Sequence, residues 1–143
     1  MIKKKVMILR TFILFCILWG MACQQTPEVE SPPPSLPFSQ SIEVGDLLYL
    51  SGQVGLNPAT KELASGIEAE TRVTMENLDR ELKAKGYGFS DVVATHVWMT
   101  DLSKIGEMSQ VYRSFFKSKD LPTRTTVGIS KLAIEASIEI AMV

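Results

Sequence analysis

The sequence predicts one α+β domain in which two helices cover a single face of a β-sheet. Three observations support this fold class. Short apolar or alternating stretches typical of strands recur through residues 37–143, two other stretches carry apolar residues at helical spacing, and the strands come in pairs around the helices. The predicted order is strand, strand, helix, strand, helix, strand, strand. A chain of 143 residues has room for one such domain.

The first half of the domain is predicted to form a hairpin and a helix. In SIEVGDLLYLSGQVG a tight turn at Gly45 and Asp46 separates two short strands. Ser65 and Glu68 then have the spacing of a capping box, which indicates a helix start. The helix itself is indicated by an apolar stripe, made of Met75, Leu78 and Leu82.

The second half is predicted to form a strand, a helix and two further strands. DVVATHVWMTDL is rich in β-branched residues and alternates, and the next stretch carries Ile105, Met108, Tyr112 and Phe115 at helical spacing before Pro122. The last two strands are expected over residues 124–131 and 137–142. Each should present alternate side chains to the two faces of the sheet.

This alternation predicts which residues lie on the face that the helices leave open. In the last strand Ile138, Ile140 and Met142 should meet the helices, so that Glu139 and Ala141 face away. In the preceding strand the core candidates are Val127 and Ile129, which would place Arg124, Thr126 and Gly128 on the open face with Glu139. Such a face could be solvated or could accept a second subunit, and we expect assembly because two helices and one sheet bury little surface.

Two charged residues are candidates for chemistry. Arg124 offers a planar fork that matches a carboxylate, but the spacing alone favours a surface arginine paired with an acidic neighbour. Glu139 alone could be a solvated strand residue. His96 lacks the companions of a metal site or a catalytic triad and is interpreted as a satisfied or partly buried strand histidine. No metal or organic cofactor is predicted.

Charge argues against a nucleic-acid partner. Residues 24–143 contain eleven of the fifteen basic residues and all sixteen acidic residues, which gives a net charge of −5. Neutralising phosphates requires a basic surface. Neither nucleic-acid binding nor ribonuclease activity is therefore expected.

The N-terminal residues predict a targeting segment. A lysine cluster precedes an uncharged run that would span about 18 Å as a helix, less than the roughly 30 Å hydrocarbon core of a bilayer. Residues 1–22 are therefore interpreted as a signal peptide. LWGMAC resembles the lipobox of bacterial lipoproteins, with Ala22 before Cys23 but Gly20 where leucine is favoured. The alternative is an uncleaved membrane anchor in which Cys23 is incidental.

The residues after Cys23 read as a spacer. Residues 23–36 include QQTPEVESPPPS, a Pro-rich composition that favours extended conformations and suits a tether between a lipid and the domain. The resulting expectation is a lipoprotein of the bacterial cell envelope, anchored to a membrane and facing away from the cytoplasm.

Several motifs together resemble the RidA/YjgF family of enamine and imine deaminases. They are LPFSQSIEVGDLLYLSGQVGLNPATKEL, ENLDRELKAKGYGFSDVVATHVWMTDL, YRSFF, LPTRTTVGISKL and SIEIAMV, in this order from about residue 36 to residue 143. The resemblance implies a chorismate-mutase-like protomer with a mixed sheet, a homotrimer, and ligand clefts between subunits. It also implies a small carboxylate, a 2-imino or 2-oxo acid, as the ligand.

The same resemblance assigns roles to individual residues. Arg124 matches the arginine that binds the substrate carboxylate, and Glu139 matches the acid that orients water. Ser51 and Gly52 match strand-end cleft residues. The chain departs from the family at four positions: Phe38 replaces a common tyrosine, Ser109 stands near a common asparagine, Thr126 near a common cysteine, and Ala141 replaces a second glutamate.

The implied reaction is hydrolysis of a 2-imino acid, formed from an enamine, to a 2-oxo acid and ammonia. Such intermediates arise in the cytosol and hydrolyse unaided in water, which conflicts with export. The alternative is therefore a non-catalytic sensor or binding module for small carboxylates at the envelope, in which Arg124 still binds the ligand.

The lipid anchor is testable on the mature protein. Mass spectrometry of membrane-extracted protein is expected to find a diacylglyceryl-modified Cys23 at the N-terminus. Cys23→Ser should abolish the modification, whereas the control Cys16→Ser changes only the segment that is removed. A mature protein that retains Met1 would contradict the interpretation.

Overall fold

The computed structural model describes residues 36–117 and 120–143. The predicted signal peptide, Cys23 and all of the predicted tether except Leu36 lie outside these residues. The elements follow the predicted order and are β1 (Ser41–Val44), β2 (Leu47–Val54), α2 (Ile67–Ala84), β3 (Ala94–Met99), α3 (Ile105–Ser114), β4 (Thr123–Gly128) and β5 (Ile138–Met142). Two 3₁₀ turns, η1 (Leu102–Lys104) and η2 (Ala133–Glu135), precede α3 and β5. Among the described helices, none combines the length and apolarity needed to cross a membrane.

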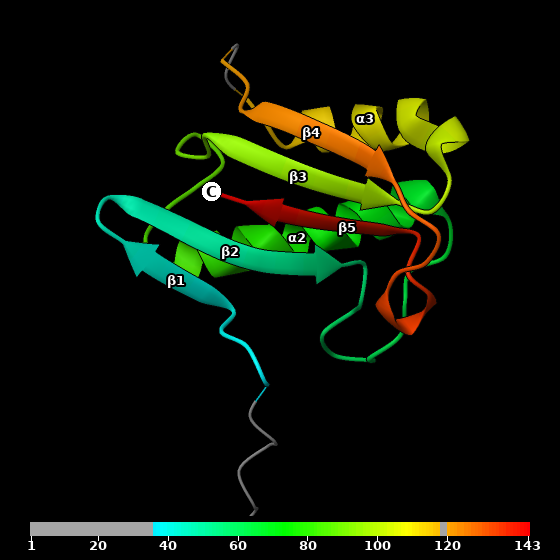
Figure 1. Ribbon diagram of the computed structural model, residues 1–143, viewed down its shortest axis with the longest axis horizontal. Coiled ribbons are helices and arrows are strands. Elements are labelled where there is room, and N and C mark those ends of the chain that lie inside the picture. The colour runs from blue at the N-terminus through cyan, green and yellow to red at the C-terminus, as the bar shows by residue number, and fades with distance from the viewer. Residues whose placement is uncertain (1–35, 118–119) are drawn as a thin grey trace, which may run out of the picture. The chain divides into compact units, whose positions relative to one another are not determined.

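The strands form one mixed sheet in the order β1-β2-β5-β3-β4, and both helices pack on the same face of it (Figure 1). β3 and β4 pair in parallel, while the other neighbours are antiparallel. α3 provides the crossover that a parallel pair requires. The predicted fold class is therefore confirmed.

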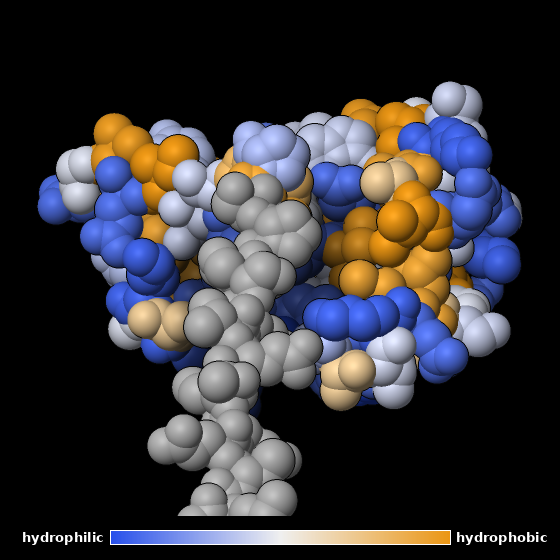
Figure 2. Space-filling view, turned by 90° about the horizontal axis from the view of Figure 1, so that it is seen from below, coloured by the Kyte–Doolittle hydropathy of each residue, from blue (hydrophilic) through white to orange (hydrophobic). Residues whose placement is uncertain are grey.

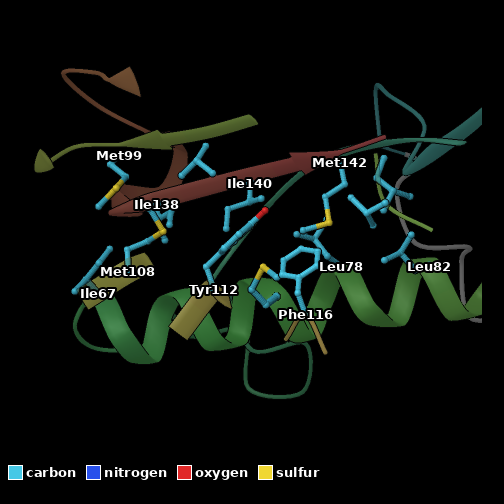
Figure 3. Packing of buried hydrophobic residues seen from close by; sticks show 14 of the residues in the cluster. Ile67, Leu78, Leu82, Met99, Met108, Tyr112, Phe116, Ile138, Ile140 and Met142 are labelled. Carbon is cyan, nitrogen blue, oxygen red and sulfur yellow. The ribbon is translucent and has the colours of Figure 1, made fainter. Parts of the chain in front are cut away.

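The core lies between the sheet and the two helices. Ile138, Ile140 and Met142 point from β5 toward α2, where Leu78 and Leu82 meet them (Figure 3). All five side chains are buried, and burial of each contributes roughly 1.5–3 kcal/mol. The predicted stripe of α2 and the predicted inward face of β5 are thus confirmed.

The start of α2 differs from the prediction. The residue before the helix is Gly66, at φ 86°, and no side chain caps the helix there. Ser65 and Glu68 therefore do not form the capping box that their spacing suggested. A positive φ of this size strongly favours glycine, so the turn into the helix is fixed by Gly66 rather than by a side-chain hydrogen bond.

The orientation predicted for β4 is wrong. In the parallel register the partners of Arg124, Thr126 and Gly128 on β3 are Thr95, Val97 and Met99, which are all buried. Residues that are neighbours in register lie on the same face of a sheet. Arg124 and Thr126 consequently lie on the helix side. Val127 lies on the open side, 40% exposed, and Ile129 follows the end of β4. Because β4 is an edge strand, apolar residues do not mark its inward face.

The open face of the sheet is rich in apolar side chains. Register with the inward residues places Ile42, Tyr49, Trp98 and Val127 on this side, together with Glu139. All of these except Trp98 and Glu139, which are half-buried, are exposed in the single protomer. Figure 2 shows another aspect of the surface, on which hydrophobic residues also gather in patches between hydrophilic ones.

Candidate functional site

Arg124 sits near the start of the edge strand β4, against helix α3. The central carbon of its guanidinium lies 5.1 Å from the centroid of the Tyr112 ring, a cation–π contact. The Tyr112 hydroxyl is 3.0 Å from Thr95 Oγ1, and Thr95 also donates to the Thr123 carbonyl at 3.2 Å. The ring that supports Arg124 is thereby tied to both β3 and β4.

The electrostatics around Tyr112 keep its ring neutral. Burial raises the pKa of the Tyr112 hydroxyl, although the bond to Thr95 and the charge of Arg124 act in the opposite direction. A neutral ring leaves the charge of the guanidinium uncompensated. The ion pairs among the described residues do not involve Arg124, so its donors are available to a carboxylate from outside.

Two further predicted site residues lie on the elements that carry Arg124 and Tyr112. Thr126 is the next residue on the same side of β4, and its hydroxyl oxygen is buried without a hydrogen-bond partner. Ser109 is half-buried on α3, one turn before Tyr112. We call these three predicted residues, with Tyr112, the arginine half-site.

Glu139 lies on the opposite face of the sheet, above Gly52. A β-carbon at Gly52 would stand 1.9 Å from Glu139 Oε1, so a larger residue here would force this carboxylate to move. The register between β2 and β5 shifts between Leu50 and Gln53, which places Gly52 in a bulge. This shift accompanies the close approach of the glutamate to the backbone.

Ser51 connects the bulge to the chain that precedes β1. Its hydroxyl donates to the Ser39 carbonyl at 2.6 Å, and its N–H donates to the Gln40 carbonyl at 2.9 Å. Phe38, directly before Ser39, is exposed. Phe38, Ser51, Gly52 and Glu139 form what we call the glutamate half-site.

The structure therefore divides the predicted site residues into two groups instead of joining them on one open face. β3 separates β5 from β4, a lateral distance of about 10 Å between strand axes. Arg124 lies on the helix side and Glu139 on the open side. One protomer does not bring these two side chains to a common ligand.

Other features of the surface do not coincide with either half-site. A pocket of about 450 Å³ lies between the ends of the two helices, lined in part by Phe89, Phe115 and Lys117, and it includes none of the predicted residues. His96 is exposed beside Trp98 on the open face, so the interpretation as a satisfied or partly buried residue is wrong. The described residues contain no cluster of three or more His, Cys, Asp or Glu side chains suited to a metal.

A buried glutamate that sequence reasoning missed lies behind the glutamate half-site. Glu70, in the first turn of α2, is 3% exposed. Its Oε1 accepts hydrogen bonds from the N–H groups of Ser137 at 2.6 Å and Ile138 at 3.3 Å. Leaving two such donors buried and unpaired would cost about 1–3 kcal/mol each.

Sequence reasoning missed Glu70 and also the contact of Tyr112 with Arg124, although both residues left a signal in the sequence. Glu70 falls on the apolar stripe of its helix, three residues after Ile67 and four before Thr74, where a charge needs a partner. Tyr112 was assigned to the core as part of an apolar stripe. Its second role depends on the register of β3 and β4, which the sequence did not reveal.

Comparison with known proteins identifies the family. A sequence profile described as Endoribonuclease L-PSP matches residues 28–143, which is most of the chain. The chain belongs to the RidA/YjgF family. A RutC family protein of Sulfurisphaera tokodaii is 39% identical over 115 residues, which cover 80% of this chain and 91% of the relative. A Dermatophagoides farinae protein named 2-iminobutanoate/2-iminopropanoate deaminase is 35% identical over 77% of this chain and 86% of its own.

Solved structures of RidA/YjgF proteins share the fold. RidA from Psychrobacter sp. PAMC 21119 superposes with a TM-score of 0.72 at 32% identity, covering 78% of this chain and 90% of its own. E. coli TdcF, determined with bound serine, also gives a TM-score of 0.72, at 27% identity and with the same coverage of both chains.

The contact between Gly52 and Glu139 is testable by a double-mutant cycle. Gly52→Ala should lower the free energy of unfolding by about 0.5–1.5 kcal/mol, because the methyl group forces the Glu139 side chain into another rotamer. In a Glu139→Ala background the same change should cost less, since the space is then free. Urea denaturation measures the change in the free energy of unfolding caused by Gly52→Ala in each background.

Gly106→Ala is the matched control, because nothing lies within 4 Å of a β-carbon at that position. It should not destabilise the protein in either background. An equal cost of Gly52→Ala with and without Glu139 would show that the two residues do not compete for this space.

Proposed function

We propose that the protein hydrolyses 2-imino acids, and the enamines that tautomerise to them, to 2-oxo acids and ammonia. The reaction would take place where the arginine half-site of one protomer meets the glutamate half-site of another, in a homotrimer. The observation that carries this proposal is the placement of Arg124 and Glu139 on opposite faces of one sheet. Neither side chain is occupied by an ion pair among the described residues.

Related proteins support the class of ligand and reaction. One relative bears the name of a 2-iminobutanoate/2-iminopropanoate deaminase, and the TdcF structure contains serine, a small molecule with a carboxylate. A 2-imino acid presents the same carboxylate next to its reactive carbon. Arg124 would bind that carboxylate through two parallel hydrogen bonds.

The open face supports the proposed assembly. On this face exposed Ile42, Val44 and Tyr49 form an apolar patch over β1 and β2, and exposed Val127 adds an apolar side chain on β4, at the opposite edge of the sheet. A ring of three protomers would bury this surface and repeat one contact three times. Of the residues first expected to explain assembly, Thr126 and Gly128 lie on the helix side, and only Ala141 lies on the open face.

The two half-sites would divide the chemistry. Arg124 holds the carboxylate, which fixes the imine carbon near a water molecule that Glu139 orients. Glu139 accepts a proton as the water oxygen bonds to the imine carbon and passes it to the imine nitrogen, which gives a carbinolamine. Glu139 then takes the hydroxyl proton and delivers it to the amino group, so that ammonia leaves as the hydroxyl becomes the carbonyl of the 2-oxo acid. A positioned general base of this kind contributes about 10²–10⁴-fold.

The chain's own residues would set the substrate range. Phe38 offers an apolar ring without a hydroxyl, and Ser109 has a shorter polar reach than an amide. The buried hydroxyl of Thr126 has no partner within the protomer and could donate to a bound carboxylate. Small aliphatic imino acids fit this combination better than polar ones.

Separate tests of binding and hydrolysis distinguish the roles of the two charges. Calorimetric titration with 2-oxobutyrate should show that Arg124→Ala and Arg124→Lys both weaken binding, because each loses the fork. If the ion pair is desolvated, truncation should cost on the order of 2–5 kcal/mol. Glu139→Ala should retain binding and lose hydrolysis, measured as ammonia released from 2-iminobutanoate generated by a dehydratase.

Arg72→Ala, on the exposed side of α2, is the matched control and should change neither quantity. Thermal melts confirm that each variant is folded. A folded Arg124→Ala protein that binds like the parent would refute the assigned role. A parent protein that binds 2-oxobutyrate but does not accelerate hydrolysis would instead identify a carboxylate-binding module.

A further inference from the structure

The pairing of β5 with β2 ends at Glu139. Val54, the last residue of β2, is the partner of Glu139, and the chain then leaves the sheet. Ser137 and Ile138 precede Glu139 at the start of β5, where the strand is no longer paired with β2. Their N–H groups both donate to Glu70 Oε1, so a single carboxylate oxygen takes the place of a strand partner.

The segment before β5 has an intrinsically unfavourable backbone conformation, so contacts with other elements must hold it in place. Ile134 and Glu135 have φ values of 51° and 62°, in the left-handed region that is unfavourable for a β-branched residue. On the β3 side the Ser137 carbonyl accepts a hydrogen bond from Thr100 N–H at 3.0 Å. Ser137 is therefore held between Thr100 and Glu70, and the start of β5 depends on both.

Two glycines at the end of β2 make room for two glutamates. A β-carbon at Gly52 would collide with Glu139, and one at Gly55 would stand 2.3 Å from Glu70 Cγ. Glu70 and Glu139 therefore pack against backbone positions three residues apart, Glu70 from α2 and Glu139 from β5. Buried Glu70 therefore contacts the end of β2 and also hydrogen-bonds to the start of β5, the strand that carries half-buried Glu139.

We propose that Glu70 is a positioning residue for Glu139. By fixing the N–H groups of the two residues before Glu139, it sets where the Glu139 carboxylate lies relative to Gly52. Glu70 is buried beneath the sheet, so it acts on Glu139 through the backbone of β5 and not by touching a ligand. This inference rests on the proposed role of Glu139 in hydrolysis.

The experiment compares Glu70→Gln with Glu70→Met. Glutamine retains an oxygen that can accept both N–H bonds, whereas methionine has similar length and no strong acceptor. Glu70→Met is expected to lower kcat for 2-iminobutanoate by about tenfold or more, because small misplacements of catalytic groups are costly. KM and the affinity for 2-oxobutyrate should stay near parent values, and Glu70→Gln should retain most of the activity.

Two controls separate positioning from general destabilisation. Leu82→Ala removes a buried side chain near the C-terminus of α2, far along the helix from Glu70. This variant should lower Tm without a comparable loss of kcat. In a Glu139→Gln background Glu70→Met should cause no further loss, because its effect passes through Glu139. A full further loss there, or an unchanged kcat in Glu70→Met alone, would overturn the proposal.

A spectroscopic readout keeps the inference independent of activity. The ¹³C chemical shift of Glu139 Cδ and the hydrogen exchange of the Glu139 amide should change in Glu70→Met, but not in Glu70→Gln or Leu82→Ala. If the parent protein is inactive, the proposed function fails, and these signals alone decide the positioning role. Unchanged Glu139 signals in Glu70→Met would overturn it.

Discussion

The parallel register between β3 and β4 is the constraint on which the site depends. It places Arg124 beside Thr95 and so directs the guanidinium toward Tyr112 on the helix side of the sheet. The antiparallel register between β3 and β5 directs Glu139 to the other side. A shift of β4 by one residue would reverse Arg124 and dismantle the arginine half-site, because side chains alternate along a strand.

The second half-site depends on backbone positions that lack side chains. Gly52 accommodates Glu139, and Gly55 accommodates the buried Glu70 that holds the first N–H groups of β5. The carboxylate proposed to act in hydrolysis and its buried neighbour thus both pack against one short stretch of chain, residues 52–55. A larger residue at either glycine would displace a carboxylate, and removal of Glu70 would leave buried donors without an acceptor.

The fold could be predicted because its elements carry strong periodic signals. The stripe of α2 and the alternation of β5 are each dense in apolar residues, so their inward faces were evident from the sequence. β4 gave no such signal. Its inward residues are Arg124, Thr126 and Gly128, and its apolar Val127 faces outward, so alternation pointed to the wrong side.

The sequence predicted candidate residues for the site but not how they are arranged. The family motifs led to Arg124, Gly52 and Glu139, but motif positions contain no information on which sheet face each side chain occupies. Glu70 and Tyr112 lie on helix stripes, where a buried role is visible and a role in supporting another residue is not. Such roles follow from hydrogen bonds and stacking between elements distant in the chain.

The most direct test of a shared site is complementation between two inactive variants. Arg124→Ala and Glu139→Ala protomers would be mixed by co-expression, and hydrolysis of 2-iminobutanoate would be measured on the whole purified trimer population, in which mixed trimers and both homotrimers are present. If each site takes its arginine and its glutamate from different protomers, random mixing in equal amounts restores about a quarter of the parental sites. Recovery near that level is the predicted result. Mixed trimers without activity would contradict a site shared between protomers.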